Sequence, residues 1–217
     1  IPESMETTHY SVMDKLGNTV GITTTINLSY GNKKIVDGAG FLLNNEMDDF
    51  ASSPGSQNAF GLIGYEANSI KPAKRPLSSM SPTIVLTPEG EPLMTIGAAG
   101  GSRIITTVLQ IIVSVVDHNL SVQDAINLGR THSQWIPDVI RYEGKNKMNT
   151  EFNQFLPSLS DKQIIELEKL DHKFEDGNVE SGMYYLARAH GIMYKNGQFF
   201  TGVDWRGNGE ISDGITY

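Results

Sequence analysis

Two adjacent threonines near the start of the sequence, Thr7 and Thr8, stand where an irregular polar segment gives way to a strand-like pattern. If the Glu6–Thr7 peptide bond is cut, Thr7 carries a free α-amine beside its own hydroxyl. That amine can accept the hydroxyl proton, so a single residue supplies both nucleophile and general base. Most Thr-Thr pairs are ordinary strand residues, and the catalytic interpretation therefore needs support from elsewhere in the chain.

A polar row in the next expected strand is a first candidate for such support. Residues 20–27 alternate in character, and the two-residue period of a strand places Thr23, Thr25 and Asn27 on one face. Three polar residues on one face would suit the floor of a site. A face turned to solvent explains the same pattern equally simply.

A second candidate is the acidic stretch at residues 44–50, which contains Glu46, Asp48 and Asp49. Clustered carboxylates can hold an ammonium group or Ca²⁺, or can form a solvated turn. The spacing does not match a calcium-binding loop. An organic cation and a plain turn therefore remain as the two interpretations.

The third candidate is a glycine pair, Gly100 and Gly101, between an expected strand and an apolar helix that runs to about His118. This arrangement presents free backbone N–H groups at a helix N-terminus. The glycines fit neither the dinucleotide-binding nor the P-loop pattern. They could bind phosphate, form an oxyanion hole, or make a tight turn before a buried helix.

Bulk properties exclude several classes of function. The 217 residues, 39% hydrophobic and 19% charged, are typical of a globular protein. The net charge of −8 argues against nucleic acid as a partner. The absence of cysteine excludes disulfides and thiolate chemistry, and the five histidines lack metal-ligand spacing, so we expect no metal and no cofactor. The longest apolar run, residues 104–116, is too short to span a bilayer.

The expected scaffold mixes hairpins and helices in an α+β arrangement. One antiparallel hairpin is predicted from residues 8–14 and 19–28, and a second from residues 83–86 and 92–96. Residues 51–76, rich in Ser, Pro, Gly and Asn, are expected to be irregular. Further elements are expected to be helices after the capping residues Ser121 and Ser160, and short strands near 183–187, 191–194 and 198–203.

Four stretches together resemble the small subunit of γ-glutamyltranspeptidases, in the same order and with similar spacing. They are residues 7–12 (TTHYSV), 43–50 (LNNEMDDF), 74–83 (KRPLSSMSPT) and 100–105 (GGSRII). The resemblance implies an N-terminal-nucleophile hydrolase fold, an αββα sandwich of two stacked antiparallel sheets between helix layers. It further implies that residues 7–217 form the small catalytic subunit and that residues 1–6 are a residual pro-segment or the end of the large-subunit region.

By the same resemblance, Thr7 is the nucleophile, formed by autocatalytic cleavage at Glu6–Thr7, and Thr25 supplies a supporting hydroxyl. Gly100 and Gly101 are the backbone donors to the oxyanion. The residues implied in substrate binding are Asn27, Glu46 and Asp49 for the α-ammonium group, and Ser78 and Ser79 for the α-carboxylate.

The implied reaction is γ-glutamyl transfer from glutathione and related γ-glutamyl donors to water or to amino acid or dipeptide acceptors. The implied partner is a large subunit from the same precursor, which carries the arginine for the α-carboxylate, and the implied location is periplasmic or secreted. In place of the Ser-Pro that often precedes the glycine pair, this chain has Ala98-Ala99. The alternatives are another amidase of the same fold (a β-lactam side-chain acylase or a poly-γ-glutamate depolymerase), or an unprocessed scaffold without catalytic activity.

Overall fold

The computed structural model describes residues 5–144, 158–176 and 186–206. Most of the strand predicted near residues 183–187 lies outside these ranges. The strands are β1 Met5–Met13, β2 Thr19–Leu28, β3 Thr83–Leu86, β4 Pro92–Ala99, β5 Thr131–His132, β6 Ile140–Tyr142, β7 Phe174–Asp176, β8 Arg188–Lys195 and β9 Gln198–Val203. The helices are α1 Arg103–Val116, α2 Val122–Asn127 and α3 Asp161–Glu168, with short 3₁₀ helices η1 Glu46–Asp49 and η2 Glu66–Asn68.

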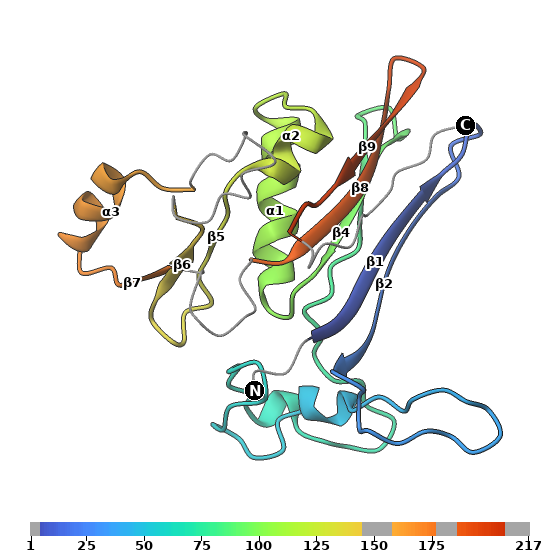
Figure 1. The fold of residues 1–217 in the computed structure, drawn as a ribbon, viewed down its shortest axis with the longest axis vertical. Coiled ribbons are helices and arrows are strands. Elements are labelled where there is room, and N and C mark those ends of the chain that lie inside the picture. Colours follow the sequence, from blue (N-terminus) through green and yellow to red (C-terminus); the bar gives the residue numbers. More distant parts are fainter. Residues whose placement is uncertain (1–4, 145–157, 177–185, 207–217) are drawn as a thin grey trace.

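Two antiparallel sheets stack face to face, as the family resemblance implied. The hairpin β1–β2 packs against β4 and β8 of a four-stranded sheet with the order β3-β4-β8-β9. Helices α1 and α2 cover the other face of that four-stranded sheet (Figure 1). A helix layer, a sheet and a second sheet of the expected sandwich therefore lie in the described part of the chain.

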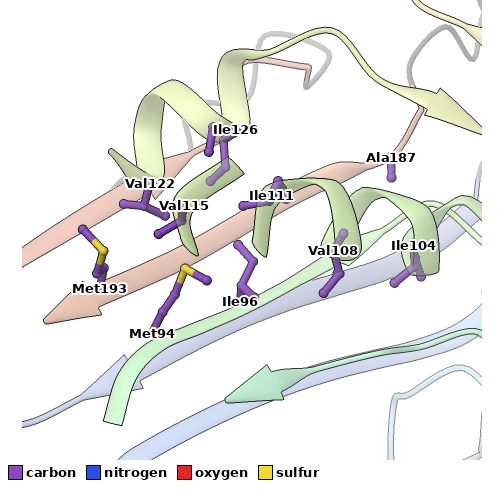
Figure 2. Close-up of a cluster of buried hydrophobic side chains, with 13 residues drawn as sticks. Met94, Ile96, Ile104, Val108, Ile111, Val115, Val122, Ile126, Ala187 and Met193 are labelled. Atoms are coloured by element: carbon purple, nitrogen blue, oxygen red, sulfur yellow. The ribbon is translucent and has the colours of Figure 1, made fainter. Parts of the chain in front are cut away.

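Helix α1 forms because its apolar residues recur with helical spacing. Ile104, Val108, Ile111 and Val115 lie on one face and are buried against the sheet. Figure 2 shows this row facing strand β4, which carries Met94 and Ile96, and strand β8, with α2 closing one end of the core. This packing fixes the start of α1, and with it the preceding turn, relative to the end of β4.

The hairpin β1–β2 has its polar face inside and an apolar face outside. Its inner face carries Thr7 and Thr25, which are partly buried. Its outer face carries the cross-strand pairs Tyr10–Ile22 and Val12–Val20, and all four of these side chains are exposed. The polar row of β2 therefore faces the sheet behind it, which rules out the solvent-face interpretation.

Three features differ from the sequence-based expectation. Strand β1 begins at Met5 rather than at Thr8, because Met5 pairs with Leu28, so the Glu6–Thr7 bond lies inside the strand. The register shifts between Met5 and Thr7, which makes an irregularity at that bond. A third sheet, β5-β6-β7 with a parallel β6–β7 pair, was not expected.

None of the helices in the described ranges has the length and apolar character needed to cross a bilayer.

Candidate active site

The two threonines of the predicted catalytic pair are direct cross-strand neighbours. Thr7 pairs with Thr25 in the β1–β2 register, and the Thr7 hydroxyl donates a hydrogen bond of 3.0 Å to Oγ1 of Thr25. That oxygen also accepts the backbone N–H of Asn27 at 2.8 Å. Because the Thr7 hydroxyl is the donor in this hydrogen bond, the lone pairs of its oxygen can be directed at an electrophile.

The end of β2 is fastened to the acidic turn η1 through Asn45. The side chain of Asn45 accepts the N–H of Leu28 at 3.0 Å, and its backbone N–H donates to Ile26 at 3.2 Å. Asn27 has a positive φ of 75° and donates its side-chain amide to the Asn45 carbonyl at 3.2 Å. The positive φ, which asparagine tolerates better than most residues, turns the strand toward the carboxylates of η1.

Glu46 and Asp49, one turn apart on η1, form an interacting carboxyl pair. Burial, followed by the charge of Asp49 and a hydrogen bond to it, raises the pKa of Glu46 to about 7. Burial also raises the pKa of Asp49, although its hydrogen bond with Glu46 acts in the opposite direction. Oε1 of Glu46 is buried and makes no hydrogen bond to the described residues. Two clustered carboxylates with an unsatisfied oxygen form a site that favours a cation.

The glycine pair connects β4 to α1. Gly100 has φ 150° and Gly101 has φ 60°, values that exclude most residues with a side chain. The carbonyls of both glycines accept hydrogen bonds from the first turn of α1, at Arg103 and Ile104. Their own N–H groups come just before the N-terminus of the helix, a place where backbone donors can bind an anion.

One pocket gathers almost all of the predicted site residues. Gly100, the chain neighbour of Gly101, is not among the residues that line it. The predicted residues that do line the pocket are Thr7, Thr25, Asn27, Glu46, Asp49, Ser78, Ser79 and Gly101. The Ser78 hydroxyl accepts the N–H of Met80 at 3.2 Å. The irregular segment 51–64 supplies much of the opposite wall, with Phe60, Leu62 and Ile63. In the described ranges, no group of three or more His, Asp or Glu side chains could hold a metal ion.

The sequence analysis missed His9. Its imidazole is 4% exposed, with Nδ1 2.8 Å from the Thr23 hydroxyl and Nε2 3.0 Å from the Ser11 hydroxyl. Because the Ser11 hydroxyl donates to the Thr95 carbonyl at 3.4 Å, we assign the ring hydrogen to Nε2 and the acceptor role to Nδ1. His9 lies two residues after Thr7 on the same strand face, so the alternation that identified the polar row of β2 applies equally to β1.

Comparison with known proteins identifies the family of this chain. The sequence profile of the family described as Gamma-glutamyltranspeptidase matches residues 1–214. The chain belongs to the gamma-glutamyltranspeptidase family. Among members of this family, it is 52% identical over 141 residues to a glutathione hydrolase proenzyme of Escherichia coli K12, covering 65% of this chain and 24% of that protein. It is 39% identical over 208 residues to a glutathione hydrolase proenzyme of Pseudomonas aeruginosa, covering 95% of this chain and 34% of that protein.

The solved structures of gamma-glutamyltranspeptidases support the N-terminal-nucleophile hydrolase fold. A T380A mutant of the Helicobacter pylori gamma-glutamyltranspeptidase superposes with a TM-score of 0.80 at 42% identity, covering 92% of this chain and 100% of the matched chain. The Pseudomonas nitroreducens gamma-glutamyltranspeptidase complexed with L-DON gives 0.79 at 38% identity, covering 96% and 100%. The chain therefore spans about a quarter to a third of the curated proenzymes but the whole of a chain in these structures.

Proposed function

We propose that this chain is the catalytic small subunit of a γ-glutamyltransferase, and that Thr7 transfers γ-glutamyl groups from glutathione-like donors to water or to amino acid or dipeptide acceptors. The observation that carries the proposal is the Thr7–Thr25 hydroxyl pair of 3.0 Å in the same pocket as the Glu46–Asp49 carboxyl pair. The first pair supplies a nucleophile, and the second a site for a substrate α-ammonium group.

The proposed reaction begins with cleavage of the Glu6–Thr7 bond, which frees the α-amine of Thr7. That amine accepts the hydroxyl proton while Oγ1 attacks the γ-carbonyl carbon of the donor. The N–H groups of Gly100 and Gly101 stabilise the tetrahedral oxyanion, and one such donor is typically worth about 3 kcal/mol of barrier. The proton then passes to the leaving amine as the C–N bond breaks, which leaves a γ-glutamyl ester on Thr7. Water or an acceptor amine resolves this ester.

The proposed partner is a large subunit cut from the same precursor. The names of the curated relatives support it, because they are proenzymes of which this chain matches only 24% and 34%. The matches that cover 100% of a single chain in the solved structures support a separate subunit of about this extent. Intact mass of the full precursor tests this point. A fragment that begins at Thr7 supports the proposal, and an uncut chain contradicts it.

The substrate class is tested by comparing turnover of a γ-glutamyl anilide and of the glutaryl anilide with the same leaving group. The two differ in the α-ammonium group that Glu46 and Asp49 would bind. Faster turnover of the γ-glutamyl compound supports our assignment. Turnover of the glutaryl compound alone would favour a side-chain acylase of the same fold.

The nucleophile is tested with Thr7→Ala and Thr7→Ser in the full precursor. Thr7→Ala removes the hydroxyl and should abolish both cleavage and turnover, whereas Thr7→Ser keeps a hydroxyl and should retain part of each. Processed and active Thr7→Ala protein would refute the assignment. Thr8→Ala, at the exposed neighbouring position, is the matched control and should leave cleavage intact.

A further inference from the structure

The turn that carries the glycine pair lies where two strands of the central sheet separate. In the antiparallel β4–β8 ladder, Ala98 pairs with Ala189 and Ala99 with Arg188. One more step in this register places Gly100 opposite Ala187. Both residues lie just outside their strands, and both have a positive φ, 150° at Gly100 and 83° at Ala187.

At this point the backbone of Gly100 lies against Ala187. A methyl group added to Gly100 would lie 2.5 Å from Cβ of Ala187 and 2.7 Å from its Cα, closer than carbon atoms approach in proteins. Ala187 is only 4% exposed, and it lies near the Ile104 end of α1 (Figure 2). The methyl group of Ala187 therefore packs against the turn at Gly100.

The corner at Ala187 is itself held by buried side chains. Arg130 donates from Nη1 to the Ala187 carbonyl at 2.8 Å, and Thr107 donates to the Leu186 carbonyl at 2.7 Å. The N–H of Leu186 donates to Oε1 of Glu143 at 3.0 Å. These three bonds join the corner to three separate parts of the fold, so the corner has little freedom to move.

Two of these anchors belong to a buried cluster of four charged side chains. Arg130 pairs with Asp204 at 2.7 Å, and Arg206 pairs with Glu143 at 2.7 Å and with Asp204 at 3.1 Å. All four side chains are at most 2% exposed. The charges hold one another and the backbone of residues 186–189 in a single arrangement, because moving any one of them would leave a buried charge unpaired.

The residue type at position 187 also needs an explanation. A φ of 83° disfavours every residue with a Cβ, and glycine would adopt it without strain. Alanine at this position has an unfavourable backbone conformation that glycine would not have, and the only group that it adds is a methyl group. That methyl carbon is the atom nearest to the point where a side chain on Gly100 would begin.

We propose that Ala187 is a positioning residue, whose methyl group, anchored by Arg130, Thr107 and Glu143, sets the place of the Gly100–Gly101 amides at the reaction centre. This inference rests on the proposed function, in which those amides stabilise the oxyanion. Ala187 itself touches neither the substrate nor Thr7. Ala187 holds the backbone of Gly100, and the position of Gly100 in turn sets that of Gly101, which lines the pocket.

The test is Ala187→Gly in the full precursor, compared with the parent protein after processing. The substitution removes the methyl group and relieves the unfavourable φ, so we expect an unchanged or higher thermal midpoint. We expect kcat per processed site to fall about tenfold or more, with KM changed less than twofold, since a displaced oxyanion donor affects the transition state most. The matched control is Ala73→Gly, the same exchange at an exposed residue with φ 59°, which should leave kcat unchanged.

A second measurement does not depend on turnover. Hydrogen exchange at the amides of Gly100 and Gly101 should become faster in Ala187→Gly and remain unchanged in Ala73→Gly. Unchanged exchange together with an unchanged kcat would overturn the positioning role. A parent protein without γ-glutamyl turnover would instead refute the proposed function, while the exchange result would still decide whether Ala187 holds the turn.

Discussion

The imidazole ring of His9 fills the space that a side chain at residue 97 would need. A methyl group placed on Gly97 would overlap the Cγ, Nδ1 and Cε1 atoms of the ring. The hairpin strand β1 and the sheet strand β4 approach closely because glycine lies opposite the histidine. Thr7 is two residues from this contact on the same strand, so the close approach of β1 to β4 also fixes the position of Thr7 relative to β4.

Gly97→Ala should therefore destabilise the protein by roughly 1–3 kcal/mol, the usual cost of overpacking a tight contact. Chemical denaturation of the full protein measures the change. In a His9→Ala background the cost should shrink by about 1 kcal/mol or more, because the overlapping ring is gone. Equal costs in the two backgrounds would show that the two residues are not coupled.

Removal of the Thr25 hydroxyl should slow the reaction without unfolding the site. Thr25→Val keeps the β-branched shape but removes the acceptor for both Thr7 and the Asn27 N–H. We expect kcat to fall about tenfold to a hundredfold, which corresponds to the loss of about 1.5–3 kcal/mol of hydrogen bonding. Thr24→Val, at the exposed neighbour on the opposite face of β2, is the control and should retain the parental kcat.

Donor binding should depend on pH through Glu46, whose pKa is raised to about 7 by burial and by Asp49. Below this pH the carboxyl is protonated and attracts an ammonium group less strongly, so KM for the γ-glutamyl donor should rise as the pH falls from 8 to 5. Glu46→Gln should raise KM at pH 8 and remove most of the pH dependence. Glu66→Gln, at an exposed position outside the pocket, should leave the KM profile unchanged.

The raised pKa of Glu46 also predicts how the stability of the substrate-free protein depends on pH, and this trend is opposite to that of donor binding. The folded-state pKa of Glu46 lies above its ordinary value of 4.5, so the folded state holds the proton more tightly than the unfolded state. This contribution is fully present below about pH 4.5 and is lost as the pH rises through about 7. In Glu46→Gln the thermal midpoint should fall less between pH 5 and pH 8. A larger fall than in the parent would contradict the assignment.

Arg206 and Arg141 should differ sharply in their contributions to stability. Arg206 is buried with Glu143 and Asp204, whereas Arg141 and its partner Glu175 are 26% and 40% exposed. Arg206→Met leaves the buried Glu143 without its paired cation and Asp204 with Arg130 alone, and should cost roughly 3–5 kcal/mol. Arg141→Met should cost at most about 1 kcal/mol. Chemical denaturation of the two variants checks the difference, and similar losses would contradict a structural role for the buried cluster.

The elements with a strong local pattern were predictable. The β1–β2 and β3–β4 hairpins follow from alternation and turn residues, and α1 follows from its apolar spacing. The helix caps at Ser121 and Ser160 are also confirmed, since each side chain accepts the N–H three residues on. Strands β5, β6 and β7 have only two or three residues each, and they exist because distant segments pair, as Ile140 does with Phe174. No local pattern indicates such a pairing.

The candidate site also has a part that the sequence predicted and a part that it did not. The motifs selected residues that the fold gathers around one pocket, and their roles remain predictions. The contact between Gly100 and Ala187 could not be foreseen, because the two residues are far apart in sequence and alanine has no preference for a positive φ. The start of β1 at Met5 was missed because the polar residues before Thr7 resemble a loop, although pairing with Leu28 makes them a strand.

The outward-facing apolar pairs of the β1–β2 hairpin have a consequence for the isolated chain. Tyr10, Val12, Val20 and Ile22 together form a hydrophobic strip on the outer face of the hairpin that carries Thr7. Produced without the large subunit proposed above, the polypeptide should bind apolar dyes and self-associate. Charged replacements on this strip should improve the solubility of the fragment, yet lower the yield of active enzyme when they are placed in the full precursor.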